Sequence, residues 1–249
     1  MKSFRSLRAE LVQLNVGLIV AADSSVIPAA KEATNTIPIV MTVVRDPVSQ
    51  GYVASLARPG GNITGLSIGM RPSGGKRLEI LKEAVPSVSR LAVLLPSSRD
   101  RGRMKFKSVS QAFGVQTQTF EFGNADELEH ALQAVLRIRP NGLMVVASPE
   151  TNFHRKKIIK FASQNRLPAI YPAAMYVMDG GLMSYGQNLR VRDRRAAYYV
   201  DRILKGAKPS DLPVEQPMKA EFAVNLKTAA AIGIKIPPEV LQRADQVIR

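Results

Sequence analysis

Apolar residues in this chain follow two patterns, short continuous runs and longer segments with helical spacing. The continuous runs, which predict strands, lie at 17–22, 37–44, 91–95, 116–121, 142–147, 169–171 and 182–185. The segments with helical spacing, which predict helices, lie at 3–14, 25–34, 48–57, 74–84, 100–113, 125–138, 153–165, 191–205 and 226–231. Strands that alternate with helices are typical of parallel sheets covered on both faces. The pattern therefore predicts an α/β fold with Rossmann-like, parallel sheets.

Glycine and proline interrupt this alternation at places where the chain is expected to pass from one α/β lobe to another. The expected crossings are residues 65–75, 185–189 and 209–217. Three crossings divide the chain into two lobes, each assembled from segments that are distant in sequence. Two such lobes can hinge about a shared cleft.

Composition is ordinary for a soluble globular protein, with 45% hydrophobic and 22% charged residues among 249. The chain has no cysteine, which excludes disulfides, thiolate catalysis and cysteine metal sites. No apolar run reaches the ~20 residues that a membrane span requires. The first fifteen residues also lack the apolar core of a signal peptide. Read as written, the chain is expected to stay in the cytoplasm.

A formal net charge of +15 raises the question of nucleic acid or an anionic membrane as partner. The basic residues cluster at Arg99, Arg101, Arg103, Lys105 and Lys107, then Arg155, Lys156, Lys157 and Lys160, then Arg190, Arg192, Arg194 and Arg195. These clusters alternate with apolar helix positions, and aromatic residues do not interleave with them as base stacking requires. The preferred interpretation is solvated helix faces, with no nucleic-acid partner.

The sequence contains no phosphate-binding loop, dinucleotide-binding motif or zinc-hydrolase motif. The nearest match to a phosphate-binding loop, residues 70–77, has Met70 and Arg77 at two of the four defining positions. The dinucleotide-binding glycine motif does not occur. His130 and His154, the only histidines, lie too far apart in sequence to form a zinc-binding helix pair. We therefore expect a protein without catalytic activity, cofactor or metal.

Polar groups follow several predicted strands, at the edge where open parallel sheets bind ligands. Ser24 and Ser25 precede a helix, so they can seat a carboxylate with the helix amides or simply cap the helix. Asp46 ends the next strand and can pair with an ammonium group, although Asp46 alone is more often part of an ordinary Asp-Pro turn. The candidates after later strands are Ser97, Ser98, Tyr171, Tyr185 and Asn188.

Tyr171 and Tyr185 are the best candidates for the aromatic walls of a binding site, and ordinary packing explains each of them equally well. A free amino acid needs an anion seat, a cation partner and a side-chain pocket. The strand-end residues include groups for all three. They therefore predict a small polar ligand, such as an amino acid.

The run TIPIVMTVVRDPVSQGYVASLARPGGNITG, residues 36–65, resembles one family: the extracytoplasmic substrate-binding proteins of ABC importers, in the subgroup associated with aromatic amino acid uptake. Further fragments in the family's order are LVQLNV at 11–16, KRLEILKE at 76–83, LPAIY at 167–171, GGLMSYG at 180–186, ILKGAKP at 203–209, LPVEQP at 212–217 and NLKTA at 225–229. The resemblance covers nearly the whole chain.

This resemblance implies a type I periplasmic-binding architecture with a ligand in an interlobe cleft and an ABC permease as partner. The first lobe would contain residues 1–66 and 187–206, and the second lobe residues 67–186 and 207–249. The family is exported, and its first lobe opens with a strand, a helix and a second strand. Because residues 3–14 already resemble a later helix, the first lobe is expected to be incomplete and ligand binding weak.

Three alternatives remain open from the sequence. A cytoplasmic ligand-sensing domain can share the two-lobed fold, but no helix-turn-helix segment precedes it here. An α/β enzyme would turn its ligand over instead of retaining it. A nucleic-acid binder would show a steep dependence of affinity on salt.

Overall fold

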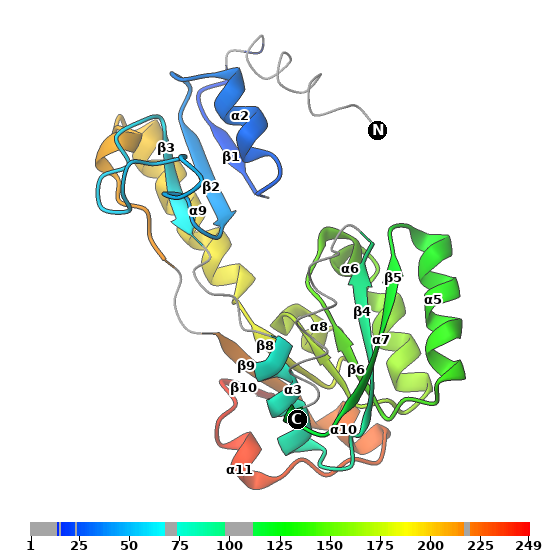
Figure 1. The fold of residues 1–249 in the computed structure, drawn as a ribbon. Coiled ribbons are helices and arrows are strands. Elements are labelled where there is room, and N and C mark those ends of the chain that lie inside the picture. The colour runs from blue at the N-terminus through cyan, green and yellow to red at the C-terminus, as the bar shows by residue number, and fades with distance from the viewer. Residues whose placement is uncertain (1–13, 15, 23, 68–73, 98–111, 217–219) are drawn as a thin grey trace. The chain divides into compact units, whose positions relative to one another are not determined.

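The computed structural model describes residues 14, 16–22, 24–67, 74–97, 112–216 and 220–249. The chain forms two compact units: unit 1 comprises Met1–Arg71 and Leu189–Lys219, and unit 2 comprises Pro72–Asn188 and Ala220–Arg249 (Figure 1). Strands and helices alternate in both units, and the strand pairs are parallel except one. The predicted α/β class is therefore confirmed. The predicted helices at 3–14 and 100–113 lie outside the described residues, apart from their last positions.

Unit 1 is built on a parallel sheet in the order β1-β2-β3. Its elements are β1 (Ile19–Ala21), α2 (Ile27–Ala33), β2 (Ile39–Val44), β3 (Ile63–Ser67), α9 (Leu189–Leu204) and the 3-10 turn η1 (Pro209–Asp211). Every residue of β2 is buried. Met41 packs in one cluster with Ile27 of α2, whereas Val40 packs in another with Tyr199 of α9. Because successive strand residues point to opposite faces, α2 and α9 cover the two faces of the sheet.

Strand β3 approaches β2 very closely at Gly65. This residue has φ 125°, and a Cβ atom there would lie 2.2 Å from the carbonyl oxygen of Met41. The pairing register of the two strands also shifts between Met41 and Val44. Only glycine fits such a position. The sequence analysis treated Gly65 as the start of a crossing, and the structure places it inside a strand.

The predicted helix at 48–57 is wrong, because this segment is a series of turns. The side chain of Asp46 accepts a hydrogen bond from the amide of Ser49 at 3.1 Å, and Gly51 then turns the chain with φ 68°. Asp46 therefore stabilises a tight turn, and the left-handed glycine prevents the helix from continuing.

Residues 207–216 belong with unit 1, although the sequence analysis assigned them to the second lobe. Glu215 forms a parallel bridge with Leu66 of β3, and its amide donates to the carbonyl of Gly65 at 3.0 Å. Leu212 and Val214 are buried in the two clusters that flank the sheet. The segment therefore lies beside β3 like an additional short strand. Its prolines had suggested only a connection between lobes.

Unit 2 is built on a seven-stranded sheet in the order β10-β9-β8-β7-β6-β4-β5, in which only β8 and β9 pair antiparallel. Its strands are β4 (Arg90–Pro96), β5 (Gln116–Phe122), β6 (Gly142–Val145), β7 (Ala169–Tyr171), β8 (Met183–Gly186), β9 (Glu221–Asn225) and β10 (Gln246–Ile248). Its helices are α3 (Gly74–Ala84), α5 (Ala125–Arg137), α6 (Pro149–Phe153), α7 (Arg155–Gln164), α8 (Ala174–Met178), α10 (Leu226–Ala231) and α11 (Pro238–Leu241).

The predicted helix at 153–165 corresponds to α7, and a separate short helix, α6, precedes it and ends at Phe153. Ser148 starts α6 with a capping box, in which its side chain and that of Thr151 each bond the other residue's amide. Among the helices of the described residues, none is both long and apolar enough to cross a lipid bilayer.

Candidate functional site

In unit 1, the candidate residues follow the first two strands, which are neighbours in the sheet. Ser24 and Ser25 follow β1 in an exposed turn, and Asp46 follows β2. The N-cap of α2 is Val26, whose side chain makes no capping hydrogen bond, and Pro28 lies in the first turn. Proline has no amide hydrogen, and the helix has only seven residues. The anion seat predicted from this helix therefore has few amides to offer beyond the two serines.

Asp46 is exposed beyond the end of β2 and remains a carboxylate. Hydrogen bonds from the side chain and the amide of Ser49 lower the pKa of Asp46 below its ordinary value. The end of the neighbouring strand β3 is linked to the end of β2, because the Ser67 hydroxyl donates a hydrogen bond to the carbonyl of Arg45 at 3.3 Å. The carboxylate thus stands at a fixed edge of the sheet, where it can accept a cation.

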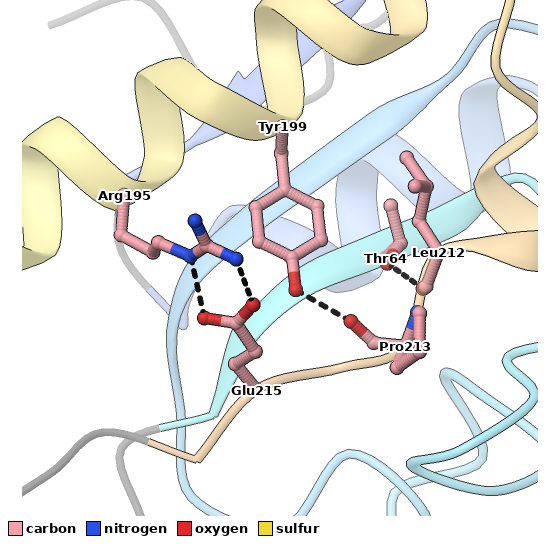
Figure 2. Close-up of polar contacts among 6 residues, drawn as sticks. All are labelled: Thr64, Arg195, Tyr199, Leu212, Pro213 and Glu215. Atoms are coloured by element: carbon pink, nitrogen blue, oxygen red, sulfur yellow. Dashed lines mark hydrogen bonds and ion pairs between the residues drawn. The ribbon is translucent and has the colours of Figure 1, made fainter.

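A polar network that the sequence analysis missed holds the segment 212–215 against α9 and β3 (Figure 2). Arg195 and Glu215 form a two-bond ion pair, with Arg195 Nε 2.7 Å from Glu215 Oε2. The Tyr199 hydroxyl donates to the carbonyl of Pro213 at 2.5 Å, and the Thr64 hydroxyl donates to the carbonyl of Leu212 at 2.5 Å.

This ion pair also sets the charge state of Glu215. The hydrogen bonds from Arg195 lower the pKa of Glu215, although partial burial acts in the opposite direction. The network uses groups from three separate parts of the sequence: β3, α9 and the segment 212–215. No local motif marks such an arrangement, so it could not be predicted from the sequence.

In unit 2, Arg77 of α3 joins two strand ends. Its side chain is buried, and its Nε donates to the carbonyl of Tyr185 in β8 at 3.1 Å. Its Nη1 also contacts the carbonyl of Val145, the last residue of β6, at 3.5 Å. A buried guanidinium is tolerated only when it is hydrogen-bonded. The available sequence signal was a charged residue on the apolar face of a helix, in line with Leu81 and Ala84.

Tyr171 is part of the unit 2 core. Only 1% of it is exposed, and its ring stacks on that of Tyr176 with centroids 5.1 Å apart. A Cβ atom at Gly181 would lie 2.6 Å from the same ring, so the backbone also packs tightly against it. Burial raises the pKa of Tyr171. Tyr171 therefore does not form the aromatic wall of a binding site that the sequence analysis had predicted, because its side chain is buried in the core.

The other unit 2 candidates lie near strand ends with different surroundings. Ser97 is exposed, and its amide donates to the carbonyl of Phe122 at 3.1 Å. Tyr185 is half-buried and packs on the unit 2 core, while Asn188 is half-buried beyond β8. Ser98 lies outside the described residues. Ser97, Tyr185 and Asn188 therefore remain candidate ligand contacts.

Phe153 is an exposed aromatic residue that the sequence analysis did not single out. It ends α6, the short helix that follows β6, and it is 82% exposed. The helix is held in place because the Tyr176 hydroxyl donates to the Asn152 side chain at 2.9 Å. Burial raises the pKa of Tyr176 to about 12, so this hydroxyl stays protonated. An exposed aromatic ring on an anchored helix is suited to stacking on another flat ring.

Metal binding finds no support in the part of the chain that the structure describes, where no three His, Asp or Glu side chains gather. The groups at the strand ends are instead carboxylate, hydroxyl and aromatic side chains. Such groups recognise small organic ligands.

Comparisons with known proteins agree with this chemistry. A family model described as ABC transporter substrate binding protein matches residues 5–248. A tyrosine-binding protein of Clostridioides difficile (strain R20291) is 28% identical over 244 residues, which cover 94% of this chain and 68% of that protein.

Solved structures give the same picture. An ABC domain from Streptococcus pneumoniae in complex with L-Trp is 26% identical, with a TM-score of 0.80 over 98% of this chain and 83% of that one. A conserved domain protein from Vibrio cholerae is 27% identical, with a TM-score of 0.80 over 98% of this chain and 82% of that one. The type I periplasmic-binding fold is thereby confirmed, and this chain belongs to the family of ABC transporter substrate-binding proteins.

Proposed function

We propose that this substrate-binding protein binds an aromatic L-amino acid and presents it to an ABC permease. The observation that carries the proposal is the similarity, over nearly the whole chain, to one relative described as tyrosine-binding and to another solved with L-Trp. Both ligands combine an ammonium group, a carboxylate and an aromatic ring. Family membership supports binding in place of catalysis, so we expect the ligand to be recovered unchanged.

Unit 1 supplies the proposed contact for the ammonium group. Asp46 is exposed at a strand end and its lowered pKa keeps it ionised at neutral pH. Hydrogen bonds from charged donors to a carboxylate are shorter and stronger than neutral ones. Ser24 and Ser25, exposed beyond the neighbouring strand, are the proposed donors for the ligand carboxylate. The exposed ring of Phe153 in unit 2 is the proposed contact for an aromatic side chain.

A thermal-shift screen tests the proposal. The panel contains L-tyrosine, L-tryptophan and L-phenylalanine, their D-enantiomers, L-leucine and small organic acids. We expect a concentration-dependent rise in melting temperature with one or more aromatic L-amino acids. Ligand at a hundredfold excess over its dissociation constant adds about 2.7 kcal/mol to stability. Stabilisation by another solute class, with none by the aromatic L-amino acids, would contradict the proposal.

Binding without turnover needs its own check. The bound compound is released from the protein by denaturation and identified by mass spectrometry. We expect the unmodified amino acid after prolonged incubation. Accumulation of a modified product that depends on the protein would favour the enzyme alternative.

A further inference from the structure

We propose that the outer face of α9 is a docking surface for an anionic phospholipid bilayer. This surface, called here the arginine row, consists of Arg190, Arg194, Tyr198 and Arg202. Successive members are four residues apart, so they lie along one side of the helix. With a rise of about 1.5 Å per residue, the row is roughly 18 Å long. The three arginines are exposed, and Tyr198 is 40% exposed.

The charges of α9 are unequally matched. Arg195 pairs with Glu215, Arg192 pairs with Asp193 at 2.6 Å, and Lys205 pairs with Asp201 at 2.9 Å. By contrast, the three arginines of the arginine row have no acidic partner within the described parts of the chain. Like charges at this spacing repel one another and weaken a helix. An anionic surface that lies against the three arginines would offset this repulsion.

The opposite side of α9 is already occupied. Ala196, Tyr199 and Ile203 are buried in the cluster that joins α9 to the unit 1 sheet. The helix therefore cannot turn over to insert an apolar face into a membrane. Its outward side is a row of exposed arginines that includes Tyr198, with the 45% exposed Val191 beside the first arginine. Basic side chains around a tyrosine suit the headgroup region of a bilayer, where aromatic residues concentrate.

Nucleic acid fits this surface less well. A base would have to stack on the Tyr198 ring, and the guanidinium carbon of Arg195 already lies 3.9 Å from the centre of that ring. Arg202 approaches the same ring at 6.0 Å. The formal charge of +15 on the whole chain also attracts the protein to any extended anionic surface. The arginine row gives that attraction a defined place of contact.

Vesicle co-sedimentation tests the proposal with the full chain. Vesicles of phosphatidylcholine alone are compared with vesicles in which one third of the lipid is phosphatidylglycerol, at low and at high salt. We expect binding only to the anionic vesicles, and loss of that binding at high salt. Equal binding to both vesicle types, or binding that salt does not change, would overturn the proposal.

Two triple variants locate the contact. The first combines Arg190→Gln, Arg194→Gln and Arg202→Gln, and the control combines Arg137→Gln, Lys156→Gln and Lys160→Gln on exposed positions of unit 2. Each basic residue at an anionic surface changes binding about fivefold, so the first variant should bind roughly a hundredfold more weakly. The control loses the same net charge but should change binding only a few-fold. Equal losses in the two variants would overturn the proposal.

A fluorescent reporter gives a readout that does not depend on overall affinity. The chain contains no tryptophan, so Val191→Trp places a single indole between Arg190 and Arg194. We expect a blue shift of its emission with anionic vesicles and none with phosphatidylcholine. Duplex DNA and poly-glutamate are titrated in parallel. No shift with anionic vesicles, or tighter row-dependent binding to either polymer at the same salt, would overturn the lipid assignment.

Discussion

Unit 1 and unit 2 hold their strand ends in place by different means. In unit 1 the segment 212–215 is fixed by an ion pair whose partners, Arg195 and Glu215, have side chains 38% and 37% exposed. In unit 2 the strand ends are fixed by buried groups. Arg77 bonds to backbone carbonyls of β6 and β8, and Tyr171 stacks on Tyr176. Because an ion pair fixes the edge of unit 1, the stability of that edge should depend on pH and on charge. The edge of unit 2 should respond to changes of core volume.

The largest expected effect is on unit 2, from Tyr171→Ala. Removing a fully buried aromatic ring leaves a cavity and loses its packing, which costs roughly 3–5 kcal/mol. Hydrogen exchange of the amides in β6, β7 and β8 measures the loss locally. Tyr198→Ala in unit 1 is the control, because its 40% exposed ring should cost less than about 1 kcal/mol. A small effect of Tyr171→Ala would show that this tyrosine is not a packing residue.

Asp46→Asn should lower the affinity of unit 1 for the ammonium group of the ligand. The asparagine oxygen can still accept the hydrogen bond from the Ser49 amide, so the turn is preserved while the charge is lost. We expect the dissociation constant, measured by calorimetry, to rise at least tenfold. Asp211→Asn removes one exposed carboxylate from the same unit and should leave affinity unchanged. Equal effects of the two substitutions would remove Asp46 from the proposed site.

Glu215→Gln should make the stability of unit 1 less dependent on pH. The folded-state pKa of Glu215 is lowered, so the ion pair stabilises the fold above the ordinary value near 4.5 and loses this contribution as pH falls through the folded value. Because the pair is partly exposed and screened by solvent, the expected loss is about 1 kcal/mol or less.

Hydrogen exchange of β3 amides in the parent chain and the Glu215→Gln variant, at neutral pH and below pH 4.5, measures this difference. The two proteins should differ at neutral pH and converge in acid. Glu239→Gln in unit 2 is the control, since Glu239 is exposed. A constant difference between parent and Glu215→Gln at all pH values would show that the carboxylate charge is not what fixes the segment.

Phe153→Ala should have the smallest effect on stability, within about 0.5 kcal/mol, because the ring is 82% exposed. Its effect on ligand binding separates unit 2's exposed aromatic group from its buried ones. We expect a several-fold loss of affinity for an aromatic ligand, as stacking between rings contributes about 0.5–1.5 kcal/mol. Phe153→Tyr, which keeps the ring, should retain affinity. Unchanged affinity in Phe153→Ala would leave the ring without a role in binding.

The sequence predicted the buried strands well because their signal is local. The run at 37–44 contains β2, all of whose residues are buried, and the run at 91–95 lies within β4. The prediction from the sequence failed where contacts with distant segments determine the structure. The segment 212–215 is held beside β3 by hydrogen bonds from Thr64, Arg195 and Tyr199, which are distant in sequence.

The candidate site was predictable in position but not in orientation. Asp46 and Tyr171 both come at strand ends, as predicted. Asp46 is exposed because it begins a turn, whereas the Tyr171 ring is drawn under Tyr176 and Gly181 into the core. Spacing in the sequence does not distinguish these outcomes, because both depend on the elements that follow the strand. Phe153 escaped notice because it read as the start of one long helix.

Calorimetric titration of the parent chain with L-tyrosine and L-tryptophan tests the central claim most directly. The account predicts saturable binding of one ligand per chain, absent with the D-enantiomers and weaker in the Asp46→Asn variant. Saturable binding of L-leucine or an organic acid, with no heat from either aromatic amino acid, would contradict it.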